Sequence, residues 1–144
     1  MLYKKLTYDY IRGLVGGKGI FTFSTYKAQK KKIPSFQLKM NAKDVELMQR
    51  VVETMGLDSR VYVYNYQGND GHKRQRQATL IVRELGNLKN IVAPFFYNRL
   101  AGNKASQFED WLERIGHDPL VPESYKIIYR LHENGYYKKN PKFL

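Results

Sequence analysis

Four stretches of the chain alternate between hydrophobic and polar residues, as half-buried strands do. They are GIFTFSTYK (19–27), IPSFQLKMN (33–41), RVYVYNYQ (60–67) and QRQATLIVRE (75–84). Successive side chains of a strand point to opposite faces of a sheet, so one set of positions is predicted to face a core. That set is Phe21, Phe23, Phe36, Leu38, Val61, Val63, Leu80 and Val82.

Hydrophobic residues at spacings of three and four predict helices before, between and after these strands. One helix follows Asn41, whose side chain suits an N-cap, with Asp44 in the place of a capping-box acid. Another helix, at 85–96, is expected to end or kink at Pro94. The remaining helices are predicted at 6–15, 103–115 and 122–134.

The order of these elements is α-β-β, then α-β-β again, then helices, which predicts an α+β fold. No long polar linker divides it, so a single domain is expected from residue 1 to 135. A basic C-terminal tail is expected from residue 136 to 144.

Composition predicts a globular chain with a real core, since 42% of the 144 residues are hydrophobic. The absence of cysteine excludes disulfides and thiolate metal sites. No apolar run approaches the roughly 20 residues of a membrane helix. The first residues also lack the apolar segment of a secretory signal.

Charge changes the picture most. The chain has 25 Lys and Arg against 13 Asp and Glu, a net charge of +12. Eight basic residues and no acid lie between Tyr10 and Lys43, and five basic residues with one acid lie between Ser59 and Arg83. Such an excess on the predicted strands and hairpins favours a polyanionic partner, above all nucleic acid.

The face of the sheet opposite the core set is the predicted nucleic-acid-binding surface, because it combines hydrogen-bonding groups, rings and few acids. It holds Thr22, Ser24, Tyr26, Ser35, Gln37, Lys39, Tyr62, Tyr64, Tyr66, Gln77 and Thr79. The hairpin tips add Lys27, Lys30, Lys31, Lys32, Lys73, Arg74 and Arg76, which are predicted to contact phosphates. Two plainer interpretations stay open: tyrosine and threonine favour strands in general, and lysine-rich loops also protect sheet edges from aggregation.

The segment IRGLVGGKG, Ile11 to Gly19, resembles the nine-letter motif of the LAGLIDADG homing endonuclease family, single-motif type. SFQLKMNAKDVELMQRVVETMG then resembles the family's second strand and following helix, and LGNLKNIVAPFFYNRLAGNKASQFEDW its later helices and basic turn. The resemblance covers roughly residues 8 to 115. It implies an α-β-β-α-β-β-α fold with a curved antiparallel sheet, backed by helices, that sits in the major groove of DNA; a C-terminal helix and the tail would follow here.

In this family the eighth letter of the motif is an acid that holds a divalent metal for strand cleavage. Here the eighth letter is Lys18, and the sixth, commonly Asp, is Gly16. Mg²⁺ needs carboxylate and phosphate oxygens, whereas an ammonium group only donates hydrogen bonds. Asp9 lies at the other end of the predicted helix, about 13 Å from Lys18 by helix rise. We therefore expect a degenerate site with no catalytic residue, no metal ligand and no cofactor, in which Lys18 binds phosphate; Mg²⁺ would be needed only by an active nuclease.

Further positions follow from the same resemblance. Gln37 and Lys104 match polar or basic active-site positions of some relatives and are predicted to bind a nucleic-acid backbone. Gly13 and Gly17 keep the small residues through which two motif helices pack together. Arg12 replaces the usual Ala and is expected to hinder that packing, so a homodimer is possible but disfavoured.

Other candidate site residues receive plain structural interpretations. His72, His117 and His132 match no metal spacing and are predicted to lie on the surface, and Trp111 is predicted to lie in the core. The motif glycines themselves have an alternative explanation, a tight turn that needs positive φ.

The leading hypothesis is a catalytically degenerate nucleic-acid-binding protein that favours RNA slightly over DNA. It would serve as a maturase-like protein or as a structural part of a ribonucleoprotein such as an organellar ribosome, with the tail YYKKNPKFL ordering against RNA. An intracellular location, in the mitochondrial or another organellar matrix, is expected from the resemblance. The alternatives are a site-specific DNA-binding protein, an active DNA endonuclease working with a partner chain, and a basic protein-interaction module.

Overall fold

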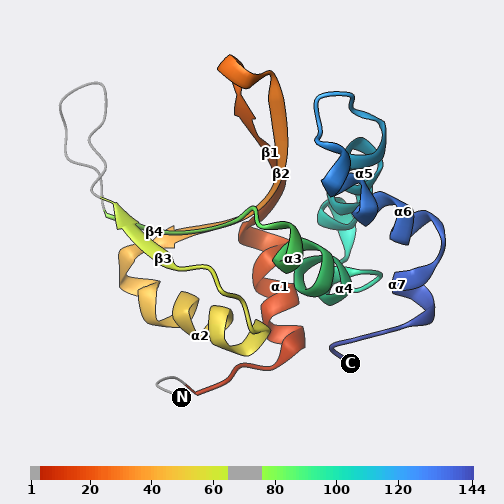
Figure 1. The fold of residues 1–144 in the computed structure, drawn as a ribbon. Helices are drawn as coiled ribbons and strands as arrows, with labels where there is room; N and C mark the ends of the chain where they lie inside the picture. Colours follow the sequence, from red (N-terminus) through yellow and green to blue (C-terminus); the bar gives the residue numbers. More distant parts are fainter. Residues whose placement is uncertain (1–3, 65–75) are drawn as a thin grey trace.

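The computed structural model describes residues 4–64 and 76–144. Within these residues four antiparallel strands form one sheet in the order β1-β2-β4-β3. They are β1 (Gly19–Tyr26), β2 (Lys31–Asn41), β3 (Val61–Tyr64) and β4 (Gln77–Val82). The sheet is curved, and the β1–β2 hairpin extends well beyond the helical body (Figure 1).

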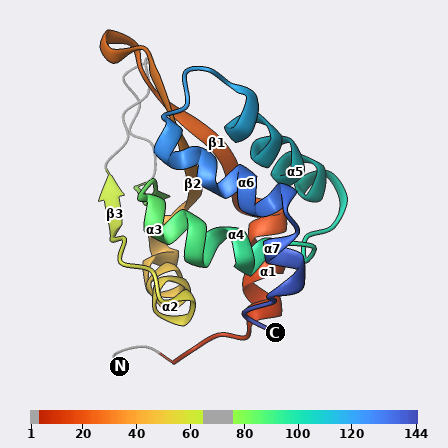
Figure 2. The same cartoon turned by 45° about the vertical axis from the view of Figure 1, so that its right-hand side comes forward.

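Helices cover one face of the sheet and then continue beside it (Figure 2). The predicted order of elements and the α+β class are confirmed. The helices are α1 (Tyr8–Lys18), α2 (Val45–Met55), α3 (Leu85–Asn87), α4 (Ala93–Phe96), α5 (Gly102–His117), α6 (Ile127–Glu133) and α7 (Tyr136–Lys139). None of these described helices is long and apolar enough to cross a membrane.

Strand register assigns the core face as the alternation predicted. Phe36 of β2 stands opposite Phe21 on one side and Val82 on the other, and Leu38 stands opposite Leu80. All of these side chains are buried. Val61 and Val63, on the edge strand β3, are only partly buried against the same core.

Helix α1 runs three residues beyond its predicted end. It begins at Thr7, whose hydroxyl accepts a hydrogen bond from the Tyr10 amide, and continues through Gly16 and Gly17 to Lys18. Neither of these two glycines has a positive φ, so the tight-turn explanation is wrong for them. Gly19, however, is required where β1 leaves the helix, because an added Cβ would lie 2.5 Å from Val15 Cγ1.

One predicted helix boundary needs correction, and the predicted end of another, at residue 96, is confirmed. The Asn41 side chain does accept a hydrogen bond from the Lys43 amide, but a 3-10 turn follows before α2 begins, and Asp44 makes no side-chain capping bond. The helix containing Pro94 continues to Phe96. A π-helical turn over Leu88–Val92 precedes the proline, and its wider hydrogen-bond spacing accommodates a residue that lacks an N–H.

The last nine residues, expected as a basic tail, pack on the helical body. Tyr137 of α7 is buried, and its hydroxyl donates to the carbonyl of Lys89 at 2.9 Å. The Phe143 ring packs against those of Tyr8 and Phe95, at centroid distances of 5.7 and 5.3 Å. The tail therefore packs on the protein itself, and its ordering against RNA stays a prediction.

Candidate nucleic-acid interface

The free face of the sheet carries the side chains that alternation assigned to it. Register places Tyr62 opposite Thr79 and Thr79 opposite Lys39, so three strands contribute to one row. Tyr64 and Gln77 form the neighbouring row. None of the four strands contains an aspartate or glutamate, so a phosphate approaching this face meets no like charge from the strands.

Exposure across this face is uneven. Ser35 and Thr79 are buried, and Thr22, Ser24 and Gln37 are half-buried. The Gln37 amide donates to the Ser35 hydroxyl at 3.1 Å, because a long side chain on a curved sheet reaches over its short neighbour. Ser35 and Thr79 were predicted as exposed binding residues, and that prediction is wrong; Lys39, Gln77, Tyr26, Tyr62 and Tyr64 are the predicted face residues that solvent reaches.

Two tyrosines on the edge strand form the aromatic part of the face. Tyr62 and Tyr64 are 55% and 50% exposed, and their rings lie near-parallel with centroids 6.3 Å apart. Tyr26, at the far end of β1, instead accepts a hydrogen bond from the Arg83 guanidinium at 3.1 Å. We call Tyr62 and Tyr64 the tyrosine pair.

The tip of the β1–β2 hairpin has three lysines without described partners beside one that is paired with an acid. Lys27, Lys30 and Lys31 are exposed. Lys32 instead donates to the Asp118 carboxylate at 3.0 Å, and its amide donates to the carbonyl of Leu120. Lys32 is therefore not a free cation in this structure, because its charge holds the hairpin against the loop after α5, and its phosphate contact stays a prediction.

The same ion pair affects the ionisation of the Asp118 carboxyl group. A hydrogen bond from the Leu120 amide and the bond from Lys32 lower the pKa of the Asp118 carboxyl below its ordinary value of 3.8. The carboxylate is therefore charged at neutral pH and fixes this side of the hairpin.

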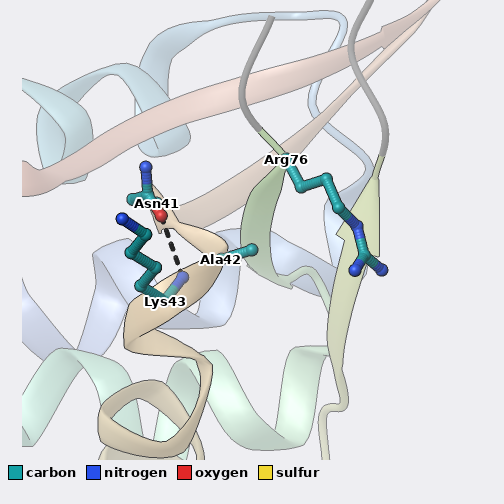
Figure 3. A pocket seen from close by; sticks show the side chains of 4 residues that line it. All are labelled: Asn41, Ala42, Lys43 and Arg76. Atoms are coloured by element: carbon teal, nitrogen blue, oxygen red, sulfur yellow. Dashed lines mark hydrogen bonds between the residues drawn. The ribbon is translucent and has the colours of Figure 1, made fainter.

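The second hairpin is only partly described: Tyr66, Lys73 and Arg74 lie outside the described residues, as does His72. Arg76, at its foot, is exposed and lines a cavity of about 380 Å³ with Asn41, Ala42 and Lys43 (Figure 3). The two cationic side chains point in different directions in this view, so they do not converge on one point. Arg76 adds positive charge to the edge of the face.

The end of the motif helix is open to solvent. Gly16, Gly17 and Lys18 are exposed, and nothing lies within 4 Å of an added Cβ at either glycine. No described residue forms a hydrogen bond or ion pair with the Lys18 side chain. Its charge is therefore available to an external anion.

Lys104 lies at the same end of α1. Its Nζ donates to the carbonyl of Gly19 and to Gln107 Oε1, the second at 3.3 Å. Gln107 Oε1 also accepts from the Phe21 amide at 3.1 Å, so α5 is tied to the start of β1. Gly16, Lys104 and Gln107 line an open cavity of about 580 Å³ together with Ala101, Asn103 and Ser106.

Gln107 is absent from the sequence-based set of site residues. The sequence does contain a signal for it, since a glutamine three residues after Lys104 on a helix lies on the same face. Its pairing with a strand amide 86 residues away has no such local signal.

The residues that the sequence resemblance aligns with the family's metal positions offer no ligand for a divalent cation. Gly16 offers no side chain, and the ammonium of Lys18 is a donor that cannot ligate a metal. Asp9, on the first turn of α1, is bonded to Arg12 at 3.1 Å. Among the described residues no group of three histidine or acidic side chains could hold a metal ion.

Arg12 points into the protein. It is 5% exposed, and its guanidinium donates to the carbonyls of Phe95 and Phe143 at 2.9 and 2.6 Å. The side chain therefore leaves Gly13 and Gly17 uncovered, with nothing within 4 Å of an added Cβ at either position. The expected obstruction of helix pairing by Arg12 is wrong, because carbonyls distant in sequence draw the side chain inward.

The remaining predictions concern two histidines and a tryptophan. Trp111 is a core residue, 1% exposed, and its Nε1 donates to the carbonyl of Thr22 at 2.8 Å. His132 is not a surface residue: its side chain is 15% exposed, and its Nδ1 lies 2.8 Å from the Tyr97 hydroxyl. His117 is exposed, as predicted.

Solved structures of homing endonucleases have a similar fold. One is I-GzeII in complex with its DNA target, 22% identical with a TM-score of 0.63; the match covers 93% of this chain and 45% of that one. Another is I-TnaI, 18% identical with a TM-score of 0.58, with 91% and 99% covered. I-SmaMI bound to cleaved DNA is 20% identical with a TM-score of 0.62, with 94% and 47% covered. This chain thus spans less than half of the I-GzeII and I-SmaMI chains and nearly all of I-TnaI.

No curated protein matches the chain. The family model of the LAGLIDADG endonucleases matches residues 11–115, which include most of α1, the whole described sheet and most of α5. A match over this much of the sequence, with the family's fold around it, shows that the chain belongs to the LAGLIDADG endonuclease family.

Proposed function

We propose that this chain is a nucleic-acid-binding protein that does not cleave its target by itself. The observation that carries the proposal is Lys18, an exposed cation without a described partner at the motif position where the family places its metal-holding acid. Gly16 supplies no replacement, and Asp9 is at the other end of the helix, bonded to Arg12. A phosphate reaching this end of α1 would meet an ammonium group directly rather than a bound metal.

The binding surface proposed is the free face of the sheet with the hairpin tip and the end of α1. Exposed cations without described partners extend along it: Lys18, Lys27, Lys30, Lys31, Lys39 and Arg76. Each such cation can neutralise a backbone phosphate and release counterions, which makes affinity depend steeply on salt. A basic protein-interaction module would lack that steep dependence.

RNA is the preferred polymer in this proposal. The exposed groups of the face are mainly cations and tyrosine rings, while Ser35 and Thr79, expected to read base edges, are buried. Stacking on exposed tyrosine rings suits RNA with unpaired bases, which supports RNA as the polymer. The exposed donors of Lys39, Arg76 and Gln77 also suit base edges in a duplex groove. Duplex DNA is the second candidate, supported by the curved sheet and by the DNA complexes of I-GzeII and I-SmaMI. The ribonucleoprotein role and the organellar compartment stay predictions from the sequence.

We also propose that two copies pair through α1. Gly13 and Gly17 leave a shallow, uncovered surface on this helix, and Arg12 is withdrawn from it. Gly13→Leu should shift a concentration-dependent dimer to monomer in sedimentation velocity, because the added side chain separates the helices. Gly86→Leu, at another exposed helical glycine with open space around it, should leave the dimer unchanged. A wild-type protein that stays monomeric at all concentrations would contradict the pairing.

Crosslinking in cells followed by sequencing of the recovered nucleic acid tests the main proposal. We expect RNA fragments to dominate, and recovery of DNA from defined sites would instead select the second candidate. Purified protein incubated with that target and Mg²⁺ should release no cut strand. Metal-dependent nicking that survives Lys18→Ala would overturn the proposal and establish an active nuclease.

A further inference from the structure

The tyrosine pair has no hydrogen-bonding role within the described protein, unlike several of its other tyrosines. Tyr97, Tyr125 and Tyr137 use their hydroxyls within the protein, bonding to His132, the Arg83 carbonyl and the Lys89 carbonyl. No described residue bonds the hydroxyl of Tyr62 or Tyr64, and these are the two most exposed tyrosines among the described residues. Two large rings thus face solvent at the rim of the sheet, although burying them would be favourable.

The geometry of the pair presents flat aromatic surface. Tyr62 and Tyr64 are two residues apart on β3, so both project from the same face. Their planes are inclined by 30° and their centroids are 6.3 Å apart. Because β3 is an edge strand, a planar group can reach these rings from beyond the sheet.

Three exposed cations lie on the same part of the sheet as the pair. Lys39 stands in the same row as Tyr62, two strands away across Thr79, a separation of roughly 10 Å from strand spacing. Arg60 precedes β3 and Arg76 precedes β4, and both side chains are exposed. None of the three cations has a described partner. Exposed rings beside free cations match a ligand that is both planar and anionic.

We propose that the tyrosine pair stacks an unpaired nucleobase of a single-stranded nucleic acid, whose flanking phosphates lie against Lys39 and Arg60. A base within a duplex is already stacked on its neighbours, so its face is available only where the strand is unpaired. The inference deepens the proposed function, on which it rests, by naming the state of the polymer at one position of the face. It does not distinguish ribose from deoxyribose, because stacking involves only the base.

Fluorescence anisotropy with labelled oligouridine tests the proposal, with an abasic oligonucleotide of equal length as the matched probe. The abasic strand keeps the phosphates and lacks the bases. Tyr62→Thr/Tyr64→Thr removes both rings while keeping residues that favour strands. We expect this variant to bind oligouridine between about fivefold and 100-fold more weakly, and the abasic strand unchanged. Tyr62→Phe/Tyr64→Phe keeps the rings and should bind oligouridine as the wild type does.

Tyr136→Leu is the control variant, because Tyr136 is 48% exposed but lies on α7, away from the sheet. It should change neither probe. Unchanged oligouridine binding by the threonine variant would overturn the inference, as would an equal loss on the abasic strand or on a duplex. Wild-type binding to duplex alone would also overturn it and leave the proposed function standing. Failure of the wild type to bind any of these polymers would refute the proposed function itself.

Discussion

Two cations of the helical side, Lys126 and Arg130, differ from two cations of the sheet face, Lys39 and Arg76, in what they contact. On the helical side, Lys126 donates to the carbonyls of Gly116 and Asp118, and Arg130 pairs with Glu123. On the sheet face, Lys39 and Arg76 have no described partner. The net charge of +12 is therefore larger than the charge available for binding, because some cations are already bonded within the protein. The available charge lies on cations such as Lys39 and Arg76. Helix α1 joins both regions, with Arg12 bonded inside the protein and Lys18 open to solvent.

The largest expected effect is on stability, when the buried and hydrogen-bonded Arg12 is replaced. Arg12→Met keeps the bulk but leaves the carbonyls of Phe95 and Phe143 without their donor. We expect the free energy of unfolding to fall by about 3 kcal/mol in urea denaturation. Arg130→Met, which breaks an exposed pair, should cost less than about 1 kcal/mol. Equal losses would show that burial does not separate the two kinds of cation.

The next largest effect is on the affinity for nucleic acid, when the charge of a cation on the binding surface is reversed. Lys18→Glu should weaken nucleic-acid binding by about tenfold or more, because a phosphate contact becomes a repulsion. Lys138→Glu changes the net charge equally on α7, and both lysines are exposed. We expect a clearly smaller loss for this variant in the same anisotropy titration. Similar losses would mean that only overall charge matters and that the end of α1 is not a contact.

The strand alternation in the sequence predicted the sheet face of the residues assigned from it, because a period of two is a local property of the chain. It did not assign Ile20, Ile33 and Ile81, which the register places on the free face. It did not predict that Ser35 and Thr79 are buried, since this depends on sheet curvature and on side chains from neighbouring strands. The inward course of Arg12 depends on carbonyls 83 and 131 residues away. Lys32 likewise finds its acid 86 residues away. Partners distant in the sequence decide which cations remain available for binding, and a local sequence pattern does not reveal those partners.

Two adjacent lysines on one hairpin differ in the same way. Lys31 is exposed without a described partner, whereas Lys32 pairs with Asp118. Lys31→Gln should reduce the slope of log affinity against log salt by about one and leave the unfolding free energy unchanged. Lys32→Gln should do the reverse, lowering stability slightly without changing the slope. A smaller salt slope in the Lys32 variant would show that nucleic acid displaces Asp118 from this lysine.

The smallest expected effect is the pH dependence of the contact that holds the hairpin. The Leu120 amide and Lys32 lower the pKa of Asp118 in the folded state, so the folded protein binds a proton there less readily than the unfolded chain. The contribution of Asp118 to stability is therefore fully present above its unfolded pKa, near 3.8, and is lost as pH falls through the lower folded value. Asp118→Asn should cost about 1 kcal/mol at neutral pH, and the difference from wild type should shrink below about pH 4. Asp110→Asn, at an exposed acid of α5 without a described partner, should show no such convergence in acid-dependent urea denaturation. The difference in unfolding free energy between Asp118→Asn and wild type could instead persist unchanged at low pH. The effect would then come from packing of the loop and not from the Asp118 charge that pairs with Lys32.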